Sequence, residues 1–311
     1  MKSPVTIVIP AYNRESTLPR TLDSVAAQTV SPARVVLVDN NSTDSTLSCM
    51  HAWAEAHPEL DVRVVTESKP GACAARNSGL HEVETDFVMF FDSDDVMLPA
   101  HVGDFSEAIR SHPDMDIFGR SIILEGLDGN RRTLYYTASS PLFNHIFRGC
   151  LSTQRMVVRT ELVHEVGGWA EDLPGWNDYE LGVRLLLATD KIYELPGEPT
   201  VITYRLGESI TGTAFSAKPQ VWERSLDRIE KHFRAAGRTE MIPLVDGRRM
   251  ILAAQYAAES TPNASRESTR LRKAVLDRTA MPLRMRLIYA HNRIFHRLTW
   301  LLVRMMIRVK N

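Results

Sequence analysis

The first hundred residues alternate short apolar runs with amphipathic segments. Runs of four or five mostly apolar residues, bounded by polar or turn-forming residues, predict buried strands. Apolar residues at helical spacing, such as Leu18, Leu22 and Val25, predict helices between them. The expected strands are Val5–Ile9, ended by Pro10, Val35–Val38, Val62–Thr66 and Phe87–Phe91, and the expected helices are Ser16–Gln28, 45–57 and Gly71–Leu80. This alternation predicts a parallel sheet with right-handed crossovers.

The rest of the chain follows a different pattern. Residues 126–129 contain two glycines and predict a hairpin between flanking strands at Asp116–Leu124 and Arg131–Tyr136. Further expected elements are a strand at Gln154–Arg159, a helix near Asp178–Thr189, and strands at Ile192–Leu195 and Thr200–Arg205. From about residue 215 the pattern is helical. We therefore expect an α/β domain over residues 1–214 and a helical extension over 215–311.

Polar segments follow three of the expected strands, at Ala11–Arg14, Asp39–Asp44 and Asp92–Asp95. Ligands of parallel α/β sheets bind beyond the carboxyl ends of the strands. Three carboxylates within Asp92–Asp95 repel one another unless a cation neutralises them, and hard divalent ions prefer carboxylate oxygens. The segment therefore suggests a Mg²⁺ or Mn²⁺ site that could also hold a diphosphate. The alternative is a solvated turn that caps a helix near residue 100.

Tyr12 and Asp39 lie at the ends of neighbouring expected strands. An aromatic ring and a carboxylate can hold a nucleobase between a stacking face and a hydrogen-bond acceptor. The alternatives are an aromatic residue at the edge of the core for Tyr12, and a cluster of helix-capping residues for Asp39–Asp44.

Composition narrows the choice of function. The chain has 37 basic and 38 acidic residues, and this balance predicts no nucleic-acid partner. Its three cysteines form no Cys-x-x-Cys pair, so neither a disulfide framework nor a zinc site is expected. The sequence contains no run of 18 uncharged apolar residues, so we expect no transmembrane helix. We expect a protein kept on the cytoplasmic side of the membrane.

Four segments in this order resemble the inverting family-two glycosyltransferases of the GT-A fold. They are VTIVIPAYNRESTLPRTLDSVAAQT, VVLVDNNSTDST, PGACAARNSGL and DFVMFFDSDD. The resemblance covers roughly residues 4–100 closely and 150–210 more loosely. It implies a mostly parallel sheet flanked by helices, with a nucleotide-binding half at 1–100 and an acceptor-binding half at 101–214. It also implies metal-dependent sugar transfer from a nucleotide diphosphate, UDP favoured, to a saccharide or lipid-linked acceptor in cell-surface polysaccharide synthesis.

The resemblance assigns roles to individual residues. Asp94 and Asp92 match the metal-binding Asp-x-Asp, with Asp94 favoured for direct contact. Tyr12 matches the residue that stacks on the base, Asp39 the carboxylate that contacts base or ribose, and Arg76 a donor-binding arginine. The full set implied for the donor nucleotide is Pro10, Tyr12, Arg14, Asp39, Arg76, Asp92 and Ser93.

Asp178 aligns with the family's catalytic base, which deprotonates the acceptor hydroxyl. The alternative is that Asp178 only caps its helix. Trp176, Trp169 and Glu180 are candidate acceptor contacts, and either tryptophan could equally belong to the core.

Two positions and one segment depart from the family pattern. Asn40 and Asn177 stand where the family usually has Asp and Glu. Residues 204–211 resemble a segment that often carries a histidine, but contain none, which leaves Arg205 as the candidate pyrophosphate contact.

Residues 279–311 contain no acidic side chain. Arg286, Arg293, Arg297, Arg304 and Arg308 share one helix face, with apolar residues around them. This pattern over 284–310 predicts peripheral contact with an anionic membrane leaflet on the inner face of the cell membrane. The alternative is a helix packed on the domain with a solvated arginine face.

Two other functions stay open at this point. One is a sugar nucleotidyltransferase, although Pro10–Arg14 lacks the glycine-rich loop expected for a triphosphate. The other is a transferase-like protein that binds nucleotide or membrane without turnover.

Overall fold

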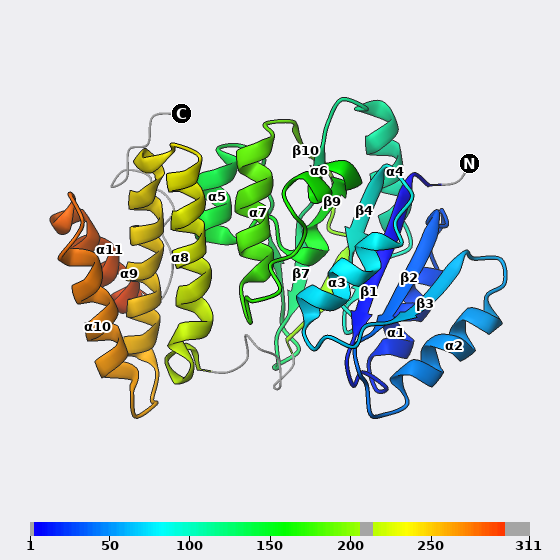
Figure 1. Cartoon of the computed structure of the whole chain (residues 1–311), viewed down its shortest axis with the longest axis horizontal. Helices are drawn as coiled ribbons and strands as arrows, with labels where there is room; N and C mark the ends of the chain where they lie inside the picture. Colours follow the sequence, from blue (N-terminus) through cyan, green and yellow to red (C-terminus); the bar gives the residue numbers. More distant parts are fainter. Residues whose placement is uncertain (1–2, 206–213, 296–311) are drawn as a thin grey trace. The chain divides into compact units, whose positions relative to one another are not determined.

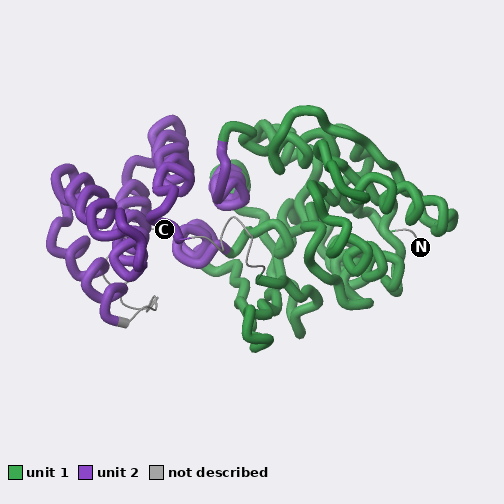
Figure 2. Tube along the Cα trace, turned by 90° about the horizontal axis from the view of Figure 1, so that it is seen from below, with its two compact units in different colours: residues 1–139, 150–172, 185–205 green, residues 140–149, 173–184, 206–311 purple. Residues whose placement is uncertain are grey.

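A computed structural model describes residues 3–205 and 214–295. The chain forms two compact units whose segments interleave along the sequence (Figure 2). The sheet unit consists of residues 1–139, 150–172 and 185–205, and the helical unit of 140–149, 173–184 and 206–311. The sequence predicts two consecutive domains, 1–214 and 215–311, rather than interleaved units. That domain division stays a prediction.

The central sheet of the sheet unit has seven strands in the order β10-β6-β9-β4-β1-β2-β3. Its strands are β1 Val5–Ala11, β2 Arg34–Asp39, β3 Val62–Thr66, β4 Phe87–Phe90, β6 Ile117–Gly119, β9 Met156–Arg159 and β10 Ile192–Glu194. The four N-terminal strands pair in parallel, as predicted. Only β9 runs antiparallel to its neighbours β4 and β6.

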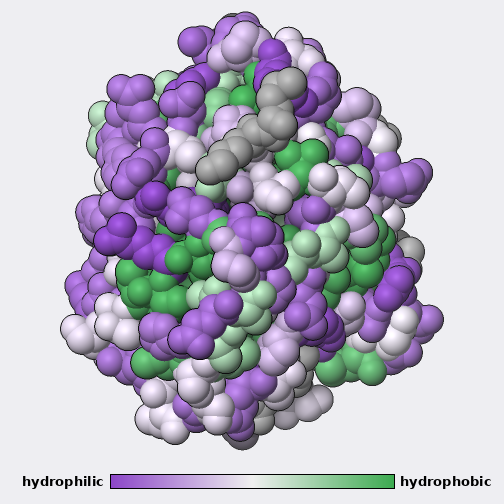
Figure 3. Space-filling view, turned by 90° about the vertical axis from the view of Figure 1, so that its right-hand side faces the viewer, coloured by the Kyte–Doolittle hydropathy of each residue, from purple (hydrophilic) through white to green (hydrophobic). Residues whose placement is uncertain are grey.

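Helices cover both faces of this sheet (Figure 1). They are α1 Leu18–Ala26, α2 Thr46–Ala56, α3 Ala72–His81, α4 His101–Ser111 and α6 Thr160–Glu165. Every residue of β1 and β4 is therefore buried, as expected of strands covered on both sides. Gly79 lets α3 approach the sheet closely, because a side chain there would collide with Val8. The edge strand β3 is only partly buried, and the side of the unit that carries it is mostly hydrophilic (Figure 3).

The expectation that Pro10 ends the first strand is wrong, because β1 continues to Ala11. Backbone groups of alternate residues bond to opposite neighbours in a parallel sheet. Val8 accepts a hydrogen bond from Phe91 on the β4 side, so Pro10 faces the same side. The β4 pairing has already stopped at Val8, and the missing N–H of Pro10 therefore costs no ladder hydrogen bond.

A second sheet of four strands has the order β5-β11-β7-β8. Its strands are β5 Val96–Met97, β7 Ile122–Glu125, β8 Arg131–Leu134 and β11 Val201–Tyr204. The antiparallel β7–β8 pair confirms the predicted hairpin. The single expected strand Asp116–Leu124 is wrong: it is divided between the two sheets. The division falls at buried Arg120, whose side chain pairs with Asp104.

The helical unit confirms the predicted helical pattern for residues 215–295. Its elements are α5 Pro141–Arg148, the first part of α7 Asn177–Ala188, η3 Phe215–Ala217, α8 Pro219–Ala235, η4 Thr239–Met241, α9 Ile242–Ala258, α10 Ala264–Leu276 and α11 Pro282–Phe295. Most residues of α9 are buried, and this helix packs against α8, α10 and α11. No helix within 3–205 or 214–295 is long and apolar enough to span a bilayer.

Candidate active site

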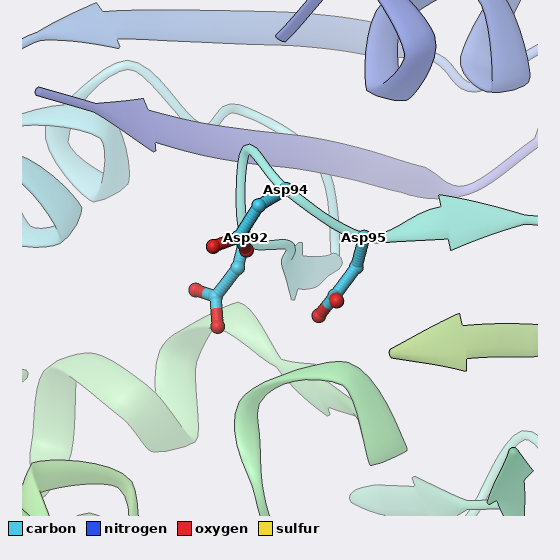
Figure 4. Close-up of side chains that lie close together, drawn as sticks. All are labelled: Asp92, Asp94 and Asp95. Carbon is cyan, nitrogen blue, oxygen red and sulfur yellow. The ribbon is translucent and has the colours of Figure 1, made fainter. Parts of the chain in front are cut away.

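The predicted acidic segment forms a loop between β4 and β5, which we call the acid loop (Asp92–Asp95). Figure 4 shows three carboxylates that leave this short loop together. One oxygen from each of Asp92, Asp94 and Asp95 lies within 4.8 Å of the others. The sheet therefore brings the predicted metal-binding pair together at the carboxyl end of β4.

Both carboxylate oxygens of Asp92 accept hydrogen bonds from side chains. Arg76 on α3 donates from Nη2 to Oδ1 at 2.7 Å, and Gln154 Nε2 donates to Oδ2. Arg76 is itself buried and stacks on the ring of Trp169, 4.5 Å from its centroid. Asp92 is thus fixed in orientation. The carboxylate oxygens of Asp94, the other predicted ligand, are less occupied by neighbouring donors. Sequence reasoning missed Gln154, because no motif surrounds it.

The acid loop fits a divalent cation electrostatically. Burial, followed by repulsion from Asp92, raises the pKa of Asp94. Burial and the two neighbouring carboxylates raise the pKa of Asp95 well above its usual range. Arg14 is only loosely placed against Asp94, with Nε 3.8 Å from Oδ2. A hard cation would relieve this crowding of negative charge, and oxygen ligands are what Mg²⁺ and Mn²⁺ prefer.

The backbone of the acid loop is anchored to α1 and β11. Arg20 donates from Nη2 to the carbonyl of Asp94 at 2.7 Å, and its guanidinium lies 3.8 Å from the ring centroid of Tyr204. Buried Asp95 accepts from the Tyr204 backbone N–H at 3.0 Å. These contacts hold the end of β11 next to the acid loop. The exposed Arg205 follows directly after β11.

The predicted base-binding residues lie on neighbouring strands. Ala11 at the end of β1 is paired with Asp39 at the end of β2, so Tyr12 and Asp39 both leave this edge of the sheet. The Tyr12 side chain is 56% exposed. Asp39 is buried, and its Oδ2 accepts from the Ser42 N–H at 3.2 Å. Its Oδ1 is buried without a hydrogen-bond partner among the described residues, and such an atom is costly unless a ligand supplies a donor.

The structure explains why the family's Asp is replaced by Asn40. The Asn40 amide donates to the carbonyls of Glu67 and Lys69, both at 2.8 Å, while its Oδ1 accepts from the N–H of Gly71. A carboxylate could not donate to those two carbonyls. Asn40 therefore ties the turn before α3 to the end of β2.

Ser93 and Trp169 are buried in the core rather than exposed at the surface. Ser93 is buried, and its carbonyl accepts from the Thr17 hydroxyl at 3.1 Å. Trp169 is 2% exposed and packs edge-on against Phe90. Its position under Arg76 favours the core alternative for this tryptophan, and acceptor contact stays an untested prediction.

Asp178 and Trp176 belong to the helical unit. Trp176 precedes α7 with φ of +50°, a strained value for a bulky residue, and its half-buried ring packs against Tyr179 and Trp222. Half-buried Asp178 lies in the first turn of α7, where its Oδ1 accepts from the Tyr179 N–H at 2.8 Å. This contact is a helix-end interaction, and it leaves the role of Asp178 as base a prediction.

Glu180 is fully buried, and its carboxylate joins α7 to α8. Arg184 contacts both oxygens at 2.9 and 2.7 Å, and His232 Nε2 lies 2.6 Å from Oε1. Burial raises the pKa of Glu180, but the hydrogen bonds from His232 and Arg184 outweigh it, and the pKa is lowered. These contacts favour a structural role, and the acceptor contact predicted for Glu180 stays untested.

Known proteins resemble this chain in sequence or in structure. A glycosyltransferase of Haemophilus influenzae, described as uncharacterized, is 22% identical over 257 residues, which cover 74% of this chain and 76% of that protein. The structure of S. aureus TarS 1-349 in complex with UDP-GlcNAc matches with a TM-score of 0.66 at 19% identity, covering 94% and 89% of the two chains. The mannosyltransferase PcManGT from Pyrobaculum calidifontis, in complex with GDP-Man and Mn²⁺, matches with a TM-score of 0.54 at 19% identity and covers 96% and 89%.

The central sheet, its flanking helices and these structural matches define a GT-A fold, which confirms the predicted fold class. The family model for glycosyl transferase family 2 matches residues 6–168, just over half of the chain. The chain belongs to glycosyl transferase family 2, as its motifs predict.

Proposed function

We propose that the protein transfers a sugar, with inversion, from a nucleotide diphosphate to a hydroxyl of a saccharide or lipid-linked acceptor in cell-surface polysaccharide synthesis. One observation carries the proposal: the acid loop, exposed Tyr12 and the unpartnered Oδ1 of Asp39 lie at the carboxyl ends of parallel strands in one unit. UDP is the favoured nucleotide, in line with the UDP-GlcNAc complex of TarS.

The donor-binding side chains with ring or charged groups each have a chemical task in this proposal. The exposed ring of Tyr12 stacks on the base, and Asp39 Oδ1 accepts an N–H from it. Arg14 and Arg205 offer positive charge to the diphosphate. Arg76 acts through Asp92, which it holds in orientation by the ion pair described above.

The transfer step needs a base but no acid. A Mn²⁺ or Mg²⁺ ion held by Asp94 and Asp92 would neutralise the charge of the departing diphosphate. Asp178 takes the proton of the acceptor hydroxyl as that oxygen attacks the anomeric carbon. The new bond forms opposite the bond that breaks, so the configuration inverts.

Donor binding is expected to stabilise the full-length protein against heat, and to do so only when metal is present. At a donor concentration one hundred times Kd, linkage supplies about 2.7 kcal/mol. That amount raises Tm by several degrees, since roughly 2–4 °C per kcal/mol is usual for domains of about 150–250 residues. A thermal-shift series with UDP- and GDP-sugars, with Mn²⁺, Mg²⁺ or chelator, measures it. Tyr12→Ala should reduce the shift without lowering the Tm of the free protein. No shift with any nucleotide sugar and metal contradicts the proposal.

We also propose that α11 contacts an anionic membrane surface. Leu283, Leu287 and Ile294 lie on one face and are 46–69% exposed, while Arg286 and Arg293 are exposed beside them. The rest of the predicted basic segment, 296–310, lies outside the described residues. Apolar and basic side chains exposed together are typical of helices in the interfacial region of membranes.

Replacing Arg286 and Arg293 by glutamine is expected to weaken vesicle binding. Each arginine near an anionic surface contributes about 1 kcal/mol, so two removals lower partitioning by roughly 30-fold. Co-sedimentation with vesicles of phosphatidylglycerol and phosphatidylcholine measures the loss. The control replaces Arg266 and Lys231 by glutamine in the same way. Both are exposed on other helices of the same unit. Equal binding by both double variants, or equal binding to purely zwitterionic vesicles, contradicts membrane contact.

A further inference from the structure

The helical unit contains a cavity that the proposed transfer reaction does not use. Its volume is about 350 Å³, within the range of small-molecule sites. The described residues that line it come from α5, η3, α9 and α11. Phe147, Phe215, Ile251 and Ala254 give it apolar walls, and Arg248 and Gln255 provide polar groups.

Arg248 brings an uncompensated positive charge to this cavity. Its guanidinium lies 4.5 Å from the ring centroid of Trp176, and burial lowers its pKa, opposed by neighbouring Tyr179. No carboxylate of the described residues forms an ion pair with it. The next residue, Arg249, is in contrast paired with Asp227, Glu230 and Asp246. A half-buried cation without an anion costs stability, and an anionic ligand removes that cost.

A second polar group in the cavity lacks a partner. Gln255 Oε1 is buried and accepts no hydrogen bond from the described residues. Glu259, which also lines the cavity, cannot serve it, because a carboxylate has no proton to donate and its oxygens accept from the backbone N–H groups of Phe215 and Ser216. Gln255 therefore needs an O–H or N–H donor from a ligand.

Helix geometry fixes the spacing of the two groups. Arg248 and Gln255 are seven residues apart on α9, two turns and about 10 Å along its axis. Ile251 and Ala254, between them in sequence, give the cavity wall an apolar surface. The ligand chemistry that matches is an anionic head, an apolar body and a hydroxyl or amide N–H further along.

We propose that this cavity binds an anionic amphiphile whose carboxylate or phosphate pairs with Arg248, whose hydrocarbon body lies on Phe147, Phe215 and Ile251, and whose distal hydroxyl donates to Gln255. This inference stands apart from the proposed sugar transfer. Its ligand is recognised by charge and apolar area rather than by a nucleotide.

Calorimetric titration of the full-length protein tests the site with decanoate, 10-hydroxydecanoate, decyl phosphate and uncharged 1-decanol. We expect one saturable site for the anions and at least tenfold weaker binding of 1-decanol. The carboxylate and phosphate arms identify which head group is preferred. Arg248→Met should weaken anion binding at least tenfold, whereas Arg266→Met, an exposed arginine on α10, should leave it unchanged. Gln255→Leu should remove the preference for 10-hydroxydecanoate over decanoate.

A blocking variant keeps the test decisive if Arg248→Met does not fold. Ala258 lines the cavity at an exposed position, so Ala258→Trp can fill the cavity with little disturbance of the core. It should abolish binding of every decyl anion while circular dichroism stays unchanged. The proposal is overturned by equal affinity for 1-decanol and decanoate, by wild-type binding in Ala258→Trp, or by the absence of saturable binding for all three anions.

Discussion

Asp94→Asn is expected to lower sugar transfer by roughly 100- to 1,000-fold, because a catalytic metal supplies several kcal/mol and each 1.4 kcal/mol changes a rate about tenfold. Asp94 is the acidic side chain best placed to reach a cation, since Arg76 and Gln154 occupy both oxygens of Asp92. The amide keeps the size of the side chain and removes its charge. The variant should therefore fold normally and need more Mn²⁺ for half-maximal activity. Steady-state rates over a Mn²⁺ titration, with donor binding by calorimetry, measure both effects.

Two comparisons make this result specific. Asp61→Asn removes an exposed carboxylate at the edge of the sheet unit, which pairs with Arg34, and should leave the metal dependence unchanged. Arg20→Met keeps all three carboxylates but removes the donor to the Asp94 carbonyl and the stacking on Tyr204. Its effect on half-maximal Mn²⁺ should be smaller than that of Asp94→Asn. Wild-type activity and unchanged metal demand in Asp94→Asn would falsify the metal assignment.

The N-terminal half of the sheet could be predicted because its signals are local. Val5–Ile9 and Val35–Val38 are nearly continuous apolar runs, which are typical of strands covered on both faces. Parallel pairing then follows from the helices between them. The carboxyl ends of these strands place Tyr12, Asp39 and the acid loop at one edge without further information.

The pairing of the remaining strands could not be predicted, because their partners lie far away in the sequence. β9 inserts antiparallel between β4 and β6, although the β4 segment lies some 70 residues earlier in the chain. Strand β5 has only two residues and pairs with β11 about 100 residues later. No periodicity exists within two residues, so only the folded sheet defines such a strand.

The difference between local signals and contacts of distant segments applies to the candidate site as well. Asp92 and Asp94 could be identified from one short segment. Gln154 touches Asp92 only because the 3₁₀-helix η1, Thr153–Arg155, packs against β4, and nothing in its neighbouring sequence marks that contact. The sequence shows that Asn40 departs from the family pattern. The hydrogen bonds that its amide donates, to carbonyl groups 27 and 29 residues further on, are visible only in the structure.

Asp178→Asn is expected to lower kcat by roughly 100- to 10,000-fold, the usual contribution of a general base, while donor affinity and metal demand stay unchanged. The donor-binding candidates belong to the sheet unit and Asp178 to the helical unit, so the two effects should separate. The amide oxygen of asparagine can still accept from the Tyr179 N–H, so unfolding stability should change by less than about 1 kcal/mol. Single-turnover rates with saturating donor, donor calorimetry and thermal unfolding measure the three quantities.

The control for Asp178→Asn is Asp190→Asn, an exposed carboxylate just beyond the other end of α7, which should keep full activity. Retained turnover in Asp178→Asn places the base elsewhere, and a parallel loss of donor affinity assigns the residue to the donor site or the fold. A protein that binds nucleotide without turnover gives a different pattern: the wild type itself transfers no sugar, and Asp178→Asn changes nothing. The base assignment therefore depends on a loss confined to the chemical step, with folding and donor binding intact.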